Sequence, residues 1–254
     1  MPAAFIGHGN PMNALEDNRH TRAWREFGAS IPRPRGVLVV SAHWFVGSSL
    51  VTAMERPRTI HDFYGFPQEL FDVGYPAPGS PAIAAEIAEV VKPRWVGLDE
   101  DGWGLDHGTW SVLVHLFPDA DIPVVQLSVN GFEGFAEHFD LGARLAPLRA
   151  DGILILGSGN VVHNLGLVDF GAGEAGFDWA VRFGEACASA MLEDPERCAA
   201  LVDHPDYALA VPTPDHFLPL APIAGLAAAG GTPVHTVTDG YVAGALSMAA
   251  YRVG

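Results

Sequence analysis

Basic residues are scarce in this chain of 254 residues, which has 14 Lys and Arg against 30 Asp and Glu and a formal net charge of −16. Phosphate backbones and anionic lipid surfaces repel such a chain, so we expect neither nucleic acid nor a membrane as a partner. No apolar run reaches the roughly 18 residues that a transmembrane helix needs. The start lacks a basic segment followed by an apolar one, so we expect no signal peptide and a cytoplasmic location.

Cysteine is nearly absent as well. Cys187 and Cys198 are too few for a disulfide framework and lack zinc-finger spacing, so we expect two buried free thiols. Charged residues make up only 17% of the chain and apolar residues 49%, which favours a sizeable core over disordered charged tracts.

Several short catalytic motifs are missing too. The chain has no His-Glu-x-x-His, no P-loop and no Gly-x-Gly-x-x-Gly that opens a helix. Gly157-Ser158-Gly159 is not a nucleophile elbow, because the pattern Gly-x-Ser-x-Gly is absent. These absences argue against a zinc protease of the usual kind, a nucleotide-binding protein and an α/β-hydrolase.

What the chain does contain is a series of apolar runs that alternate with helical patterns. The runs predict strands at Ala3–Ile6, Gly36–Ser41, Ile122–Ser128, Gly152–Gly157 and Thr232–Val237. The helical patterns cover Asn18–Ser30, Pro81–Val91, Trp110–Phe117, Gly134–Arg149, Asp178–Leu192 and Leu218–Ala229. This alternation predicts an α/β fold with a largely parallel sheet. No repeat or linker divides the chain, so we expect a single domain over residues 1–254.

The segment Met54–Gly79 differs from the rest, because it is rich in proline, glycine and aromatic residues and has no clear periodicity. A long segment of this kind inside a compact domain is often a functional loop or lid. A loop held together by its own aromatic side chains fits the sequence equally well. His61 opens the aromatic part of this segment and is a candidate to face a substrate.

Four histidines lie in short loops flanked by glycine, proline or asparagine, or follow an apolar run: His8, His43, His163 and His216. Strand ends followed by tight loops are where α/β enzymes place their chemistry, and imidazole is the commonest metal ligand. The sequence therefore predicts a histidine-rich metal site assembled from distant segments. His107 is a further candidate, although Asp106 or Thr109 beside it can also cap a helix. For each of these histidines, a buried and hydrogen-bonded core residue is the alternative interpretation.

Seven segments that contain these residues occur in a characteristic order. They are Phe5-Ile-Gly-His-Gly-Asn-Pro-Met-Asn-Ala-Leu, Val40-Ser-Ala-His-Trp-Phe, Ile60-His-Asp-Phe-Tyr-Gly-Phe-Pro, Tyr75-Pro-Ala-Pro-Gly, Gly104-Leu-Asp-His-Gly-Thr-Trp, Gly157-Ser-Gly-Asn-Val-Val-His-Asn-Leu and Pro212-Thr-Pro-Asp-His-Phe-Leu-Pro-Leu. Together they resemble the 4,5-DOPA extradiol dioxygenase family. That family is a branch of the class III extradiol ring-cleavage enzymes, related to the β subunit of protocatechuate 4,5-dioxygenase.

The resemblance implies a single α/β domain with a central mixed sheet and one divalent non-haem metal. It implies an extradiol ring-cleaving dioxygenase, which inserts both atoms of O2 into a small catecholic substrate such as DOPA or another substituted catechol. His8, His43 and His216 match the family's three metal ligands. His163 matches a histidine at the metal, either a fourth ligand or the catalytic acid/base, and His107 matches a second proton-transfer histidine.

Two departures from the wider superfamily bear on the site. His216 stands where a carboxylate usually completes the ligand set, and an all-histidine site suits Zn(II) as well as the expected Fe(II). Asn10 stands where many relatives have serine, which affects substrate contacts.

We expect His61 and Phe63 to contact a single-ring catechol. A zinc-dependent hydrolase and a non-catalytic metal-binding protein remain alternatives, and the oligomeric state is open.

Overall fold

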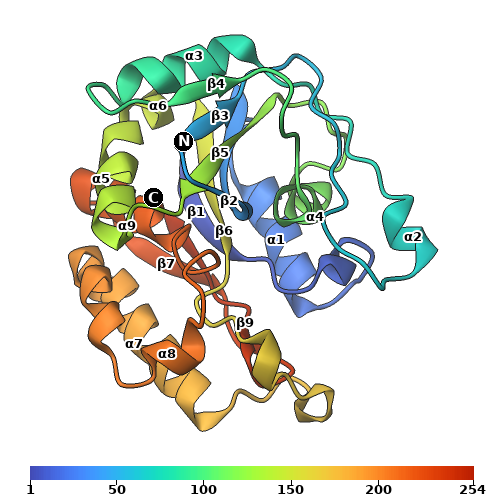
Figure 1. Cartoon of the computed structure of the whole chain (residues 1–254), viewed down its shortest axis with the longest axis vertical. Coiled ribbons are helices and arrows are strands. Elements are labelled where there is room, and N and C mark those ends of the chain that lie inside the picture. Colours follow the sequence, from blue (N-terminus) through green and yellow to red (C-terminus); the bar gives the residue numbers. More distant parts are fainter.

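The computed structural model describes residues 1–254, and its centre is an eight-stranded mixed sheet in the order β4-β3-β5-β2-β6-β1-β10-β7 (Figure 1). The strands are β1 (Ala3–Gly7), β2 (Gly36–Val46), β3 (Leu50–Thr52), β4 (Gly97–Asp99), β5 (Val124–Asn130), β6 (Ile153–Gly159), β7 (Val234–Thr238) and β10 (Ala250–Val253). The central strands β5, β2, β6 and β1 are parallel to one another. Antiparallel pairs occur where β3 meets β5 and where β10 joins β1 to β7. A separate two-stranded sheet pairs β8 (Tyr241–Val242) with β9 (Leu246–Ser247).

Helices cover both faces of the sheet, so the molecule has three layers (Figure 1). The α-helices are α1 (Arg19–Ser30), α2 (Gln68–Phe71), α3 (Pro81–Val90), α4 (His107–Leu116), α5 (Phe135–Leu145), α6 (Pro147–Ala150), α7 (Asp178–Glu193), α8 (Tyr207–Ala210) and α9 (Leu220–Gly230). Short 3₁₀ helices are η1 (Pro11–Ala14), η2 (Leu165–Leu167), η3 (Phe170–Ala172) and η4 (Pro195–Asp203). None of the helices combines the length and the apolar composition that crossing a bilayer requires.

Successive side chains of the central strands point to opposite faces of the sheet and belong to two separate cores. Leu38 and Ile155 belong to the core that includes residues of α3, α5, α7 and α9. Their chain neighbours Val39 and Leu156 belong to the core beneath α1 and α4. Because successive side chains of a strand point to opposite faces, strands buried on both faces need continuous apolar sequence. The uninterrupted runs in β2 and β6 are therefore explained by the layers on either side.

The predicted α/β fold with a mixed, largely parallel sheet is confirmed, and each of the five predicted strands is present. Three strands of the main sheet were not predicted: β3, β4 and β10, which are only three, three and four residues long. Such short strands leave too few residues for a periodic pattern. β10 lies antiparallel between β1 and β7, and so it accounts for part of the mixed character of the sheet.

Two predicted helices have different limits in the structure. The helix expected over Gly134–Arg149 is interrupted, since α5 ends at Leu145 and α6 begins at Pro147. Proline lacks the N–H that would continue the helical hydrogen bonds. The helix expected from Trp110 begins earlier, at His107, because the Asp106 carboxylate caps it by accepting the Thr109 N–H at 3.1 Å.

Both cysteines are buried and free, as expected. Burial raises the pKa of Cys198 to about 12, so its thiol stays protonated and unreactive. In the segment Met54–Gly79, the only helix is α2, and the remainder runs as an irregular chain along one side of the molecule (Figure 1).

Candidate metal centre

The five candidate histidines come together at one edge of the sheet. Because β1, β2 and β6 are parallel, their carboxyl ends meet at this edge. His8 follows β1, His43 lies in the last part of β2 and His163 follows β6. His216 comes from the loop before α9, and His107 is the first residue of α4.

Backbone hydrogen bonds hold three of the contributing loops against one another. The His8 N–H donates to the Gly159 carbonyl at 3.0 Å, and the Asn160 N–H donates to the His216 carbonyl at 2.8 Å. Gly9 has a φ of 65°, and a β-carbon there would lie 2.4 Å from the sulfur of Met248. Only glycine fits this turn, so the chain reverses immediately after His8.

The imidazole rings lie in direct contact. The ring centroids of His8 and His43 are 5.0 Å apart, and each lies 5.0–5.3 Å from the His216 centroid. His163 stacks on His216 with centroids 3.5 Å apart and planes only 3° from parallel. His107 lies against His43, with centroids 3.8 Å apart. The structure thus brings all five histidines into one cluster.

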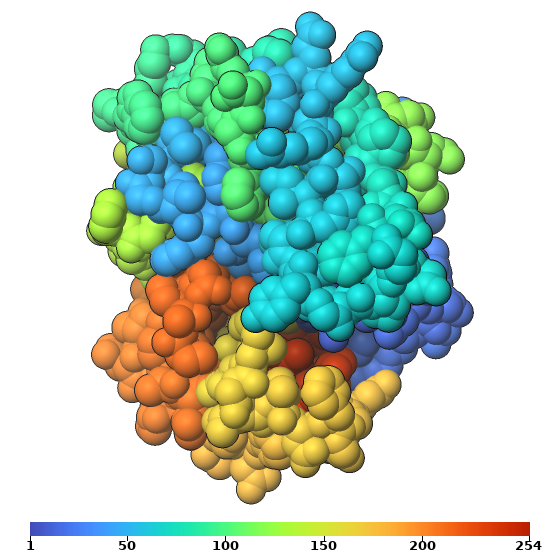
Figure 2. Space-filling view, turned by 45° about the vertical axis from the view of Figure 1, so that its right-hand side comes forward, coloured from blue at the N-terminus to red at the C-terminus, as the bar shows by residue number.

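A cavity of about 300 Å³ opens onto this cluster. All five histidines line it, together with Asn10, Asp62, Phe63, Tyr64 and Leu165 among others, and no Lys or Arg does. Figure 2 shows this face hollowed between the cyan segment that follows β3 and the gold segment that follows β6. Red residues from the C-terminal part of the chain are visible inside the hollow. The size suits a small ligand rather than a polymer.

Hydrogen bonding defines which nitrogen of His8 is free. The Ser158 hydroxyl donates to the Gly108 carbonyl at 2.5 Å and also lies 2.9 Å from His8 Nδ1. A hydroxyl has one hydrogen, so Ser158 Oγ must accept from His8 Nδ1–H. The lone pair of the neutral ring is therefore on Nε2.

His43 and His216 are held in the same manner, each by a carboxylate. The Asp62 carboxylate lies with Oδ2 3.0 Å from His43 Nδ1, and the Asp215 carboxylate contacts His216 Nδ1. A carboxylate can only accept, so Nδ1 donates in both rings. Each of these two histidines thus also has its Nε2 free.

The nitrogen geometry fits a metal ion. His8 Nε2 and His43 Nε2 lie 3.2 Å apart, and when both rings are neutral the bonds at their Nδ1 atoms leave two lone pairs facing each other. Two lone pairs cannot form a hydrogen bond, whereas two ligands about 2.1 Å from one metal lie about 3 Å apart. Acceptors on the outer nitrogen of each ring are the usual support of metal-binding histidines.

Burial keeps most of these rings neutral. Burial, followed by the charges of neighbouring imidazoles, lowers the pKa of His8 well below its ordinary value and that of His163 to about 3. Burial lowers the pKa of His216 to about 4 despite the opposing contact with Asp215. Burial also acts against a charged His43, but the contact with Asp62 and nearby carboxylate charges outweigh it and raise the pKa of His43.

The tightest group of potential ligand atoms differs from the expected ligand set. His8, His43 and His107 each offer a nitrogen within 4.8 Å of the others, whereas the expected set pairs His8 and His43 with His216. His107 comes so close because Gly108 follows it. A β-carbon on Gly108 would lie 2.8 Å from Cδ2 of His43. His107 lacks the Nδ1 hydrogen bond that His8, His43 and His216 have, since its Nδ1 has no aligned partner.

The two expected substrate contacts lie in different places. Phe63 lines the cavity and meets His107 edge-on, with ring centroids 5.5 Å apart. His61 does not line it: its Nε2 lies 2.9 Å from the Val73 carbonyl, and its ring packs against Trp110. His61 touches Phe63 edge-on, so a change at His61 can reach the cavity wall through that ring. A direct substrate contact for His61 stays a prediction.

The sequence reasoning missed Asp62, Asp215 and Ser158, the three acceptors behind the histidines. Asp62 and Asp215 each stand beside a histidine in a segment already recognised, which was the available signal. Ser158 lies 150 residues from His8 along the chain, so only the parallel pairing of β1 and β6 brings them together.

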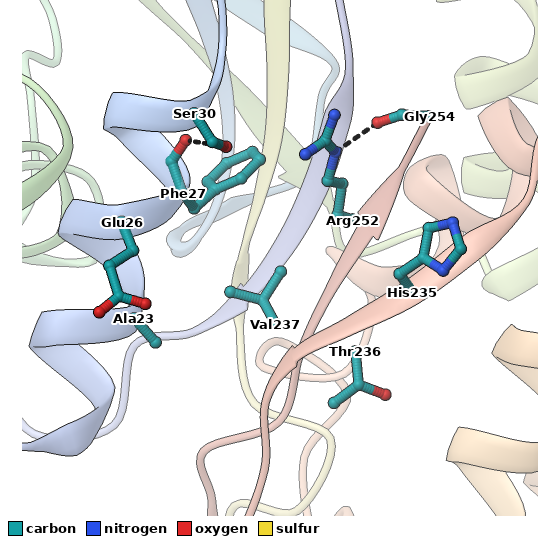
Figure 3. A pocket seen from close by; sticks show the side chains of 9 residues that line it. All are labelled: Ala23, Glu26, Phe27, Ser30, His235, Thr236, Val237, Arg252 and Gly254. Carbon is teal, nitrogen blue, oxygen red and sulfur yellow. Dashed lines mark hydrogen bonds between the residues drawn. The ribbon is translucent and has the colours of Figure 1, made fainter.

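A larger cavity of about 540 Å³ lies elsewhere, between α1 and the β7–β10 edge of the sheet (Figure 3). Its polar side chains include Glu26, Ser30 and Arg252, and His235 is its only histidine. Arg252 donates to the Gly254 carbonyl, and the Ser30 hydroxyl donates to the Phe27 carbonyl. With no cluster of ligand atoms, this cavity does not compete with the histidine cluster as a metal centre.

The fold and the cluster define an α/β protein with a group of histidines, three of which could hold a metal ion, at the carboxyl edge of its sheet. The family described as the catalytic LigB subunit of aromatic ring-opening dioxygenase matches residues 2–254. The 4,5-DOPA dioxygenase extradiol of Escherichia coli K12 is 48% identical over 100% of this chain and 95% of its own length. The protein of the same name from Beta vulgaris is 35% identical over 98% and 94%.

Solved structures agree with these relatives. The crystal structure of an uncharacterized protein from Escherichia coli K12 superposes with a TM-score of 0.87 at 42% identity, covering 100% of both chains. The chain belongs to the LigB family of aromatic ring-opening dioxygenases. The family resemblance inferred from the seven segments, and with it the enzyme class, is confirmed.

Proposed function

We propose that this protein cleaves a small single-ring catechol in the extradiol manner at one Fe(II), held by His8, His43 and His216. The observation that carries the proposal is the shared bonding of these three rings. Each has Nδ1 on an acceptor and Nε2 free for a metal, and all three line one cavity. The family membership supports the reaction class, and the donor chemistry supports the residue assignment.

A bound Fe(II) would bring both catechol oxygens together with O2 and would supply the redox change that Zn(II) lacks. Imidazole binds a metal in its neutral form, so this ligand set itself would add no negative charge. The balance of the reaction is one catechol and one O2 giving one open-chain semialdehyde, with both oxygen atoms retained in the product.

His163 suits the transfer of a proton from the catechol. Its ring lines the cavity and has no hydrogen-bond partner within the protein, unlike the three rings assigned to the metal. Burial and the neighbouring imidazoles lower the pKa of His163 to about 3, which favours the neutral ring, whose nitrogen lone pair can accept a hydroxyl proton. A group that holds a proton weakly also returns it readily when a later step needs an acid. We assign His107 as a second proton-transfer group.

The cavity lining indicates the substrate class. Phe63 and Phe66 present aromatic surface, which suits a flat ring, and Tyr64 stands at the exposed side, with 92% of its surface accessible. The plant and bacterial relatives named above are DOPA dioxygenases, and we propose a catechol of the same kind here. A small ring fits the cavity volume of about 300 Å³, and a polar substituent would be solvated on the exposed side where Tyr64 lies.

The test is reconstitution with Fe(II) under anaerobic conditions, followed by oxygen uptake on a set of catechols. We expect one O2 consumed for each ring opened and a yellow semialdehyde product. The Zn(II)-loaded protein is the matched control and should consume no O2. Oxygen uptake that leaves the catechol ring intact would contradict the proposal.

A further inference from the structure

Asp62 is the one carboxylate that contacts two of the clustered histidines. Its Oδ2 lies 3.0 Å from His43 Nδ1. Its Oδ1 accepts the backbone N–H of His107 at 2.9 Å and also lies 2.9 Å from the ring nitrogen Nδ1 of that residue. One side chain thus spans two rings whose centroids are 3.8 Å apart.

We propose that Asp62 is a positioning residue that sets His43 for metal binding and fixes His107 beside it. The proposal rests on the metal site of the proposed function. The His43 contact orients Nε2 toward the metal position. It also makes Nε2 a stronger electron-pair donor to the metal, because Nδ1–H bonds to a charged acceptor. The His107 contact fixes the first turn of α4 through its backbone and therefore fixes where that ring can lie.

The surroundings of Asp62 leave it no other role in charge pairing. No Lys or Arg lines the cavity, and no salt bridge joins Asp62 to either type of residue. Burial opposes the charged carboxylate, but the contacts with His107 and His43 outweigh it and hold the pKa of Asp62 below its usual range. The contact partners of this carboxylate are thus the two histidines themselves.

Asp106, a fully buried carboxylate near the cluster, shows the contrast. Asp106 accepts hydrogen bonds from the Ser41 hydroxyl at 2.7 Å and from the side chains of Gln126 and Trp103. It also caps α4, so its oxygens are saturated by neutral donors. Asp106 holds the scaffold together, whereas Asp62 acts on the imidazoles.

The experiment measures metal binding rather than turnover. Co(II) is titrated into the full-length metal-free protein as wild type, Asp62→Asn and the control Asp72→Asn. Asp72 lies on the same loop, is exposed and bonds only to Gln68. We expect Asp62→Asn to weaken Co(II) binding by about 10- to 100-fold and to shift the visible Co(II) bands. Asp72→Asn should match the wild type in both.

Unchanged Co(II) affinity and bands in folded Asp62→Asn overturn the proposal, even if its metal-free Tm falls, because only a structural role would then remain. If Asp62→Asn does not fold, Asp62→Glu takes its place, since it keeps the charge but moves it by one methylene. The same loss of affinity is expected there, and its absence overturns the proposal. A wild type that binds Co(II) but, loaded with Fe(II), opens no catechol ring would contradict the proposed function and leave this inference standing.

Discussion

The rings of His163 and His216 are stacked in parallel, yet they differ in their hydrogen-bond partners. His216 donates from Nδ1 to Asp215, as a metal-binding imidazole does, whereas the His163 ring has no partner in the protein. At the scale of single residues, this difference is the basis on which we propose His216 as a metal ligand and His163 as a proton-transfer group.

For His163→Ala we expect kcat to fall by about 10²- to 10⁴-fold with the metal retained, because the variant loses an acid/base and no ligand. Single-turnover kinetics and metal analysis of the same sample measure both quantities. Loss of the metal from His163→Ala would show that His163 is a fourth ligand.

For His216→Ala we expect loss of the metal, since one of three Nε2 donors disappears. Metal content after gel filtration in the presence of a weak chelator checks this, with His235→Ala as the matched control because His235 is exposed on β7. Full metal content in His216→Ala would transfer the third-ligand assignment to His107, which belongs to the tightest nitrogen group.

For His107→Ala we expect slower turnover, again by about 10²- to 10⁴-fold, with the metal kept. Because His107 offers a nitrogen near those of His8 and His43, the metal content of this variant is the decisive readout. Full activity would remove His107 from the mechanism.

The sequence supplied the residues of the cluster but not their bonding. All five histidines predicted for the metal site or for proton transfer lie in the cluster. His8, His43 and His163 meet there because the carboxyl ends of the parallel strands β1, β2 and β6 share one edge, whereas α4 and the loop before α9 bring His107 and His216. The acceptors Ser158 and Asp62 could not be assigned, because contacts across 150 and 19 residues depend on the folded geometry. The sequence motif singled out His61 as a contact, whereas in the structure its chain neighbour Asp62 lies in the cavity and contacts the clustered histidines.

At the scale of elements, the segment Met54–Gly79 fits both interpretations that its sequence allows, a functional loop and a loop held together by its own aromatic side chains. Its aromatic side chains pack on one another, with Phe63 and Phe66 centroids 5.3 Å apart. The same two rings line the cavity over the histidines, so the packed loop also forms one wall of the site.

Substitutions in this segment separate the two roles. We expect Phe63→Ala to lower kcat/KM about tenfold or more on every catechol accepted, since it removes aromatic surface from the cavity. His61→Ala should instead lower Tm, because the contact with the Val73 carbonyl and packing on Trp110 are lost. A change in substrate preference with His61→Ala at unchanged Tm would restore His61 as a substrate contact.

Element prediction succeeded where patterns were long and failed where they were short. The runs that became β2 and β6 are buried on both faces and were recognisable as such. The three-residue strands β3 and β4 were not, although β3 places the start of the aromatic segment beside the sheet. The break between α5 and α6 follows from Pro147, which the helical pattern around it concealed.

At the scale of the whole molecule, charge separates the candidate substrates. The cavity has no Lys or Arg and includes Asp62, so a carboxylate attached directly to the catechol ring would find no cationic partner. We expect protocatechuate to have a kcat/KM at least about tenfold below that of 4-methylcatechol, since an unpaired buried charge costs at least about 1–3 kcal/mol. Equal values for the two would show that the carboxylate is solvated or paired.

The central claim is that the histidine cluster binds Fe(II) and opens catechol rings with O2. The most direct measurement follows oxygen uptake and ring opening together, in wild type and His216→Ala reconstituted anaerobically with Fe(II) and then given DOPA and O2. We expect the wild type to consume one O2 per ring opened and His216→Ala to hold no iron and consume none. A wild type that binds one Fe(II) and leaves every catechol tested intact would contradict the account.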